Sequence, residues 1–205
     1  MNLNKCLEKL REIKDVSFAT VDKTGSPQVR IIDVMNIEDE KIYFLTARGK
    51  SFYKQLNETL KVAIVGLTKD YESIRVNGKV KRVDSQKETI DKLFKLNLSM
   101  NDVYPGDARY ILEAFCVYEG EVEYFDLLKK PIFRTSFSLN DGKIIKKGFF
   151  ISDKCIKCGT CYRNCPQKAI IEKETHYEIM QEHCLHCGLC FENCPVKAIE
   201  VLKWF

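Results

Sequence analysis

Eight cysteines near the C-terminus form two runs of one pattern, and they constrain this chain more than any other feature. The first run spans residues 155–165 and the second spans residues 184–194. Each reads C-x2-C-x2-C-x3-C-P, the spacing with which bacterial two-cluster proteins bind iron–sulfur clusters. The segments 155–170 and 184–199 are identical at 10 of 16 positions, six of them outside the cysteines. This repeat predicts one small electron-transfer domain built from two copies of a single unit.

The fourth cysteine of each run is expected to bind the cluster of the other run, as in bacterial two-cluster proteins. A [4Fe–4S] core needs four thiolates, and three closely spaced cysteines supply one side of its cavity. The first cluster is therefore predicted to be held by Cys155, Cys158, Cys161 and Cys194, and the second by Cys184, Cys187, Cys190 and Cys165.

Other uses of these cysteines are less consistent with the pattern. Four-cysteine zinc sites also contain C-x2-C pairs, but zinc does not require four cysteines per run in this register. A disulfide framework is disfavoured because the N-terminal segment is charged and amphipathic, unlike a secretory leader, and no apolar segment reaches membrane length. We expect a cytoplasmic, reducing location, low in oxygen. His176, His183 and His186 are interpreted as surface residues, because the clusters already have eight ligands.

The length leaves room for a second domain. With 205 residues and 45% hydrophobic composition, the chain can build a core beyond the small cluster domain. Residues 149–205 carry seven basic and seven acidic side chains, so the net charge of +4 lies in residues 1–148. No concentrated basic stripe is present, which argues against nucleic-acid binding.

The first 126 residues read as β-rich with a few helices. Helical periodicity is present at 3–13, a short helix is expected at 51–58, and Ser85-x-x-Glu88 predicts a capping box that opens a helix to about residue 97. Asn77-Gly78 predicts a hairpin turn or, as we favour, a bulge. The predicted strands are 17–21, 28–37, 41–47, 61–67, 73–83 and 110–127. Without regular βαβ alternation, these elements predict a mainly β fold with helices, an antiparallel barrel.

The succession FATVDKTGSPQVRIIDV, IYFLTARGKSFYKQL, KVAIVGL and IRVNGKVKRV resembles the pyridoxamine 5′-phosphate oxidase-like family of FMN-binding split barrels. The resemblance covers about residues 1–126. It implies a six-stranded barrel, a homodimer, and one FMN per subunit at the dimer interface. The cysteine-rich part resembles a bacterial ferredoxin with two [4Fe–4S] clusters, a small α+β domain. The expected domains are 1–127 for the split barrel, 128–148 for a linker and 149–205 for the ferredoxin domain.

The resemblance implies a set of FMN contacts. Arg30 matches the family's arginine near the FMN phosphate, and the two residues after it follow the flavin edge. Lys50 and Ser51 match the phosphate-binding segment at a helix start, where free backbone N–H groups favour an anion. The complete set is Arg30, Ile31, Ile32, Leu45, Thr46, Lys50, Ser51, Ser73 and Arg75.

Other interpretations of these and neighbouring residues were considered, and two nucleotide-binding motifs are excluded. Without the family match, Arg30 would be an ordinary strand residue facing solvent. Gly49-Lys50-Ser51 mimics the end of a phosphate loop, but Phe44 occupies the position of the earlier glycine. No G-x-G-x-x-G is present, so a nicotinamide-binding Rossmann site is not indicated. Cys6 and Cys116 are expected to be buried apolar residues.

The chain departs from the namesake enzyme, and this directs the functional hypothesis. The family's substrate-contacting lysine would fall near Met35, which cannot bind a phosphate, so vitamin B6 synthesis is not expected. No acid–base pair stands out, and the catalytic residues stay unassigned. We expect an FMN- and iron–sulfur-dependent oxidoreductase that passes electrons between a redox partner, a ferredoxin or flavoprotein, and a small acceptor such as a flavin, quinone or nitro compound. The alternatives are an electron carrier without its own substrate and a redox or oxygen sensor.

Overall fold

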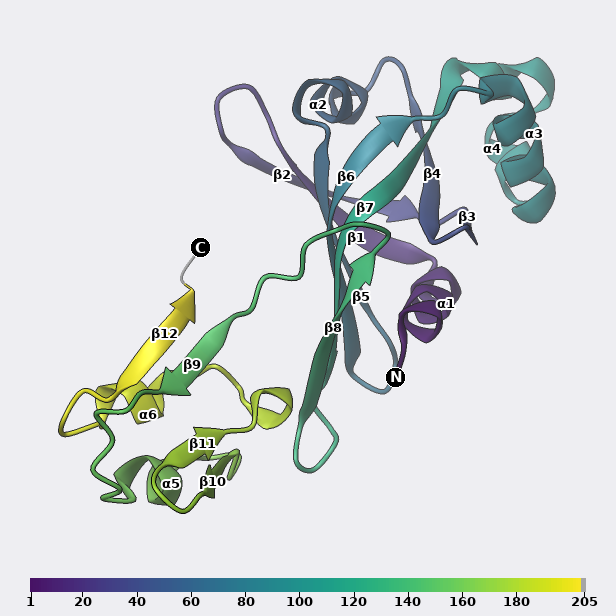
Figure 1. The fold of residues 1–205 in the computed structure, drawn as a ribbon. Helices are drawn as coiled ribbons and strands as arrows, with labels where there is room; N and C mark the ends of the chain where they lie inside the picture. Colours follow the sequence, from purple (N-terminus) through teal and green to yellow (C-terminus); the bar gives the residue numbers. More distant parts are fainter. Residues whose placement is uncertain (204–205) are drawn as a thin grey trace. The chain divides into compact units, whose positions relative to one another are not determined.

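The computed structural model describes residues 1–203 and divides the chain into two compact units (Figure 1). The larger unit comprises residues 1–124 and 136–144. The smaller comprises residues 125–135 and the chain from Ile145 onward. Residues 128–148, expected as a linker, are thus divided between the two units, and they contain the strand β8 (Phe133–Leu139).

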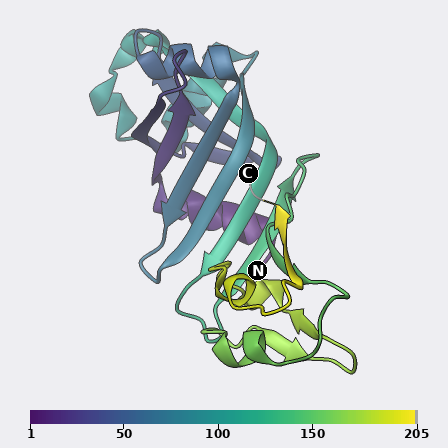
Figure 2. The same ribbon diagram turned by 90° about the vertical axis from the view of Figure 1, so that its left-hand side faces the viewer.

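The larger unit is a curled antiparallel sheet with helices, as predicted. Its strand order is β2-β1-β5-β6-β7-β4-β3, with β8 paired to β7, and Figure 2 shows β5, β6 and β7 side by side. Its other strands are β1 (Asp15–Val21), β2 (Pro27–Asp33), β3 (Asn36–Glu38), β4 (Lys41–Ala47), β5 (Lys61–Leu67), β6 (Glu72–Arg82) and β7 (Leu112–Asp126).

The curl of the sheet comes from a break in one predicted strand. Residues 28–37 were expected to be continuous, but β2 pairs with β1 and β3 pairs with β4. Between them the backbone N–H of Val34 donates to Lys14 and that of Met35 donates to Tyr43, at 2.8 and 2.9 Å. Two residues therefore join the two ends of the strand order, which bends the sheet back on itself as a half-barrel.

Two local predictions in this unit were wrong. The pairing of β5 with β6 runs without a register shift through Asn77 and Gly78, so these residues form neither a hairpin turn nor a bulge in that pairing. Gly78 is needed for packing, because a Cβ there would lie 2.4 Å from Cγ1 of Val117. The helix α3 (Gln86–Leu96) forms as predicted, but the Ser85 side chain makes no capping hydrogen bond.

The helices cover apolar faces of the sheet. In α1 (Leu3–Ile13) the Asn2 side chain caps the Lys5 N–H at 2.9 Å, and Leu7 and Leu10 are buried. The helix α2 (Ser51–Thr59) contributes Phe52 to a cluster of rings with Phe18, Phe44 and Phe115. A second core lies beneath α3. The short helical segments α4 (Met100–Val103) and η1 (Gly106–Ile111) follow it.

The smaller unit repeats one pattern twice. The strands β9 (Gly148–Ile151) and β12 (Ile199–Lys203) pair antiparallel, as do β10 (Ile170–Glu172) and β11 (Tyr177–Ile179). The helices α5 (Thr160–Asn164) and α6 (Leu189–Glu192) each begin after a glycine with positive φ, and η2 (Gln181–His183) precedes the second cysteine run. Ile170 and Ile199 are buried at equivalent positions in the core that the cysteines join.

Candidate cofactor sites

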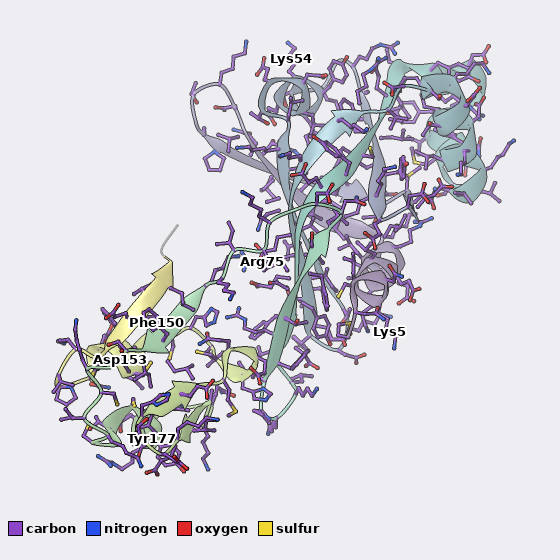
Figure 3. All side chains as sticks on the ribbon, in the orientation of Figure 1. Lys5, Lys54, Arg75, Phe150, Asp153 and Tyr177 are labelled. Carbon is purple, nitrogen blue, oxygen red and sulfur yellow. The ribbon has the colours of Figure 1, made fainter. Side chains whose placement is uncertain are left out.

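Two hollows in the smaller unit divide the eight cysteines into two sets of four. The first hollow is lined by Cys155, Cys158, Cys161 and Cys194 together with apolar side chains such as Ile151 and Ile199. Tyr177, labelled in Figure 3, lines it as well. Three cysteines of the first run thus meet the last cysteine of the second run, as the two-cluster spacing requires.

The second hollow has the reciprocal composition. It is lined by Cys184, Cys187, Cys190 and Cys165, with Phe149, Ile170 and Ile179 among its apolar neighbours. Each hollow therefore joins both halves of the repeat and is lined in large part by aliphatic and aromatic groups. Such a shell limits solvent access to a cluster and influences its reduction potential.

Backbone N–H groups at equivalent positions of the two runs donate hydrogen bonds to cysteine sulfurs. The N–H of Lys157 donates to Sγ of Cys155 and that of His186 to Sγ of Cys184, both at 3.4 Å. The N–H groups of Ala169 and Ala198 donate to Sγ of Cys165 and Cys194 at 3.3 and 3.2 Å. Hydrogen bonds to sulfur stabilise the negative charge of a cluster and help to set its potential.

The backbone conformation repeats between the two runs. Lys157 and His186, each two residues after the first cysteine of a run, both have φ of 56°, and Gly159 and Gly188 have φ of 74° and 82°. The left-handed conformation therefore recurs at the same two positions of both runs: the residue that donates to the first sulfur and the glycine after the second cysteine. Burial raises the pKa of the Cys190 thiol to about 11, so a cluster bound here must displace that proton.

The histidines of this region are not all surface residues, which corrects their predicted role. His176 is exposed, but the other two are half-buried against residues 125–135. Nδ1 of His183 lies 2.8 Å from the Ile132 carbonyl oxygen, and Nδ1 of His186 lies 2.6 Å from Nη1 of Arg134. These contacts could not be predicted from the sequence, because the partner residues lie about 50 positions away in the chain.

In the larger unit, Arg30 projects from β2 toward the interior of the barrel. Its Nη1 donates to Oγ1 of Thr20 at 2.6 Å and its Nη2 donates to Oε1 of Gln55 at 2.9 Å. The guanidinium carbon lies 4.5 Å from the ring centroid of Phe52 in α2. Within residues 1–203 every hydrogen-bond acceptor of Arg30 is neutral, and burial lowers its pKa. A half-buried cation held by neutral oxygens is suited to bind an anion. Thr20, Phe52 and Gln55 were not predicted for this site.

Three further predicted residues lie at the end of β4 and the start of α2. Lys50 and Ser51 are exposed at the N-terminus of α2, where Lys50 is the N-cap residue and no side chain caps the helix. Thr46 is only 2% exposed, and its Oγ1 finds no hydrogen-bond partner within the part of the chain described. A buried hydroxyl without a partner costs free energy unless a ligand or water satisfies it.

The other predicted contacts are not brought to the same side. Ile31 pairs with Ser17, Ser17 with Val65, and Val65 with Arg75, so the four share one outward face of the sheet. Ser73, opposite Leu67, lies on this face too, and Figure 3 labels Arg75 on the same sheet. Ile32 is half-buried on the side of Arg30, and the Leu45 side chain packs in the core beneath α3.

Sequence comparison finds two known families in this chain. Residues 4–126 match the family model described as pyridoxamine 5′-phosphate oxidase, and residues 149–201 match that of the 4Fe-4S dicluster domain. A ferredoxin from Megasphaera elsdenii is 59% identical over 27 residues, which are 13% of this chain and half of the ferredoxin's length.

Solved structures share the fold of the larger unit. A NimC/NimA family protein from Clostridium acetobutylicum superposes with a TM-score of 0.56 at 22% identity, covering 66% of this chain and 91% of that protein. A protein from the same organism, related to general stress protein 26 of the pyridoxinephosphate oxidase family, gives a TM-score of 0.54 at 15% identity and covers 69% and 99%. No helix within residues 1–203 is both long and apolar enough to cross a membrane.

Proposed function

Because the chain belongs to the pyridoxamine 5′-phosphate oxidase family and carries a 4Fe–4S dicluster domain on the same polypeptide, we propose that it is a flavin- and iron–sulfur-dependent oxidoreductase. It passes electrons between two [4Fe–4S] clusters and FMN, and from there to a small oxidised acceptor of the flavin, quinone or nitro class. The observation that carries this proposal is the sorting of eight cysteines into two hollows on a chain that also has a flavin-family barrel.

Each hollow has the ligands that one cluster needs. Cys155, Cys158, Cys161 and Cys194 hold one cluster, and Cys184, Cys187, Cys190 and Cys165 hold the other. The sulfur-directed N–H groups and the apolar lining support this assignment, because both favour a buried anionic cluster over solvent-exposed thiols.

The FMN phosphate is held by Arg30, Lys50, Ser51 and the N-terminus of α2. Arg30 supplies a half-buried cation without a carboxylate partner in the described chain, and α2 supplies free N–H groups. The Thr46 hydroxyl, buried and without a partner there, is satisfied by the flavin. When bound, FMN exchanges two electrons with an acceptor and one at a time with a cluster, so the pair connects the two kinds of transfer.

Pyridoxamine phosphate is not the substrate in this proposal. The residue near the family's substrate-contacting lysine is Met35, which is 1% exposed and packs in the core beneath α3. A buried thioether cannot bind a phosphate group. The electron acceptor is therefore not expected to bind through a phosphate group at this position.

The functional form is a homodimer with FMN at the interface. The outward sheet face carries the exposed apolar side chains Val29, Ile31, Val65 and Leu67, which are 42–71% exposed. Such a face supports association with a second copy. In the dimer, this face, with Ser73 and Arg75, completes the flavin site that begins at Arg30 of the other copy. Equilibrium sedimentation of a Val65→Glu variant is expected to show a monomer with reduced flavin content. A dimer that persists with full flavin would overturn this arrangement.

The proposal is tested on protein purified without oxygen, with absorption, iron, sulfide and flavin measured on one sample. We expect about eight irons per chain, as two cubes require, with one FMN per chain. Iron without flavin would remove the FMN assignment, and flavin without iron would remove the clusters. Protein reduced with dithionite is then mixed with a flavin, a quinone and a nitroaromatic compound. Reoxidation by at least one of them should be faster than in a flavin-free variant. Equal reoxidation rates in the two proteins would indicate an electron carrier without its own substrate.

A further inference from the structure

The two cysteine runs share one motif, but their surroundings in the smaller unit differ. His186 and Lys157 occupy equivalent positions, each two residues after the first cysteine of a run and each with φ of 56°. If the two sites had equal environments, an electron would have no preference between their clusters. The side chains around these two positions remove that equality.

The first cysteine run is bordered by solvent-exposed charges. Nζ of Lys157 lies 3.1 Å from Oε1 of Glu172 and donates to the Glu174 carbonyl oxygen at 3.1 Å. Nη1 of Arg163 donates to the Cys158 carbonyl oxygen at 3.2 Å, and Arg163 is exposed. Charges in contact with water are strongly screened, so they change a cluster's potential little.

The second run is covered by residues 125–135, which belong to the same compact unit. Nη1 of Arg134 lies 3.3 Å from the Cys184 carbonyl oxygen and 2.6 Å from Nδ1 of His186, in half-buried surroundings. Because a guanidinium has only donors, Nδ1 of His186 is the acceptor of this bond.

Gly148 provides the space for this imidazole. A Cβ at Gly148 would lie 2.7 Å from Nε2 of His186 and 2.8 Å from Oε1 of Gln181, and its φ of 111° is one that L side chains rarely adopt. Gln181 is itself held by a hydrogen bond of 2.8 Å from its Nε2 to the Phe149 carbonyl oxygen. The contact between Arg134 and His186 is therefore fixed by the packing of the unit.

We propose that Arg134 and His186 are positioning residues that raise the reduction potential of the cluster held by Cys165, Cys184, Cys187 and Cys190 above that of the other cluster. This inference rests on the proposed function, in that both clusters must be present. A reduced cluster carries one more negative charge than an oxidised one, and hydrogen-bond donors and cations beside its ligands stabilise that charge. Their effect is larger where water is excluded. A single electron that enters the domain then leaves the first cluster oxidised and rests on the second.

The test is an anaerobic redox titration of the full-length protein, with dithionite as reductant and electron paramagnetic resonance as readout. The wild type is expected to show two midpoint potentials. In Arg134→Gln only the higher one should fall, by about 59 mV, which is a tenfold change for a one-electron couple. Arg134→Lys, which keeps the charge, should restore most of the difference.

Arg163→Gln is the matched control, because Arg163 makes the same kind of bond to a cysteine carbonyl on the exposed side. It should leave the higher midpoint unchanged and move the lower one by much less. A second variant, His186→Gln, should lower the same midpoint as Arg134→Gln, so the proposal stays testable if one variant loses its cluster.

Two results would overturn the inference. One is a single midpoint for both clusters in the wild type, and the other is an equal response of both midpoints to Arg134→Gln. Fewer than about eight irons per wild-type chain would instead show that the proposed two-cluster function is wrong, so the two failures are distinguishable.

Discussion

The guanidinium of Arg30 lies 4.5 Å from the ring centroid of Phe52, and this contact joins the strand β2 to the first turn of α2. Gln55, one turn further along α2, accepts a hydrogen bond from the same guanidinium at 2.9 Å. Arg30 is thereby held near the N-terminal turn of α2, which begins at Ser51. The packing of β2 against α2 thus brings a cation close to a helix N-terminus. The proposed binding of the FMN phosphate depends on this proximity.

Arg30→Gln is expected to weaken FMN binding by about 2 kcal/mol, the size of a hydrogen bond to a charged group, which is more than tenfold in affinity. Fluorescence titration of the flavin-free protein measures this. The control is Arg109→Gln, because Arg109 lies 4.6 Å from the ring centroid of Phe94 and is also partly buried, but is not a predicted flavin contact. Equal losses in the two variants would show that Arg30 acts only through stability.

Thr46→Val should have opposite effects on stability and on flavin binding. Removing a buried hydroxyl without a partner is expected to stabilise the flavin-free chain by about 1 kcal/mol. The same change should weaken FMN binding severalfold, because the flavin loses a hydrogen bond. Thr20→Val is the contrast, since Oγ1 of Thr20 donates to Gln55 at 2.6 Å and accepts from Arg30 at 2.6 Å. Urea unfolding should find this second variant destabilised, and a stabilised one would contradict the reasoning.

Cys194→Ser tests whether the ligand sets cross between the two runs. Cys194 lines the hollow of the first run, so its loss should remove the same cluster signal as Cys158→Ser and reduce the iron content from about eight to about four per chain. Cys165→Ser should remove the other signal. Electron paramagnetic resonance of the reduced variants distinguishes these results. If Cys194→Ser instead matched Cys187→Ser, each run would bind its own cluster.

Glu72 is expected to make the stability of the larger unit depend on pH. Burial raises the pKa of this carboxyl, but hydrogen bonds from Lys9 at 2.5 Å and Tyr124 at 2.6 Å outweigh burial and hold its pKa below the ordinary value of 4.5. The stabilisation is therefore complete above pH 4.5 and is lost as the pH falls through the lower, folded-state pKa. Glu72→Gln should cost about 1–3 kcal/mol at neutral pH.

Urea unfolding between pH 3 and 7, in roughly one-unit steps, measures this effect. The difference between wild type and Glu72→Gln should shrink at the acid end. Glu38→Gln is the matched control, since Glu38 pairs with Lys92 at 2.6 Å with both side chains about half exposed. That change should stay within about 0.5 kcal/mol. A constant difference across the pH range would rule out ionisation of Glu72 as the cause.

The elements that local periodicity defines were predicted closely. The helix at 3–13 and the strands at 41–47 and 61–67 have the predicted bounds, because their apolar spacing alone decides which face is buried. The predicted strand at 28–37 is broken because Val34 and Met35 donate to backbone carbonyl groups on two different neighbours, Lys14 and Tyr43. No pattern in residues 28–37 indicates this change of hydrogen-bond partner from one neighbouring segment to another.

The two cysteine runs, their repeat and the family of the barrel could be recognised from the amino-acid sequence, because each depends on the spacing and identity of residues that are close in the chain. Tertiary packing was needed to establish that Arg134 contacts His186, that Gly148 leaves room for its ring, and that Arg30 rather than Ile31 lies on the inner face of the sheet. These relations join residues tens of positions apart or depend on register. They arise when the whole chain packs, and no short segment specifies them.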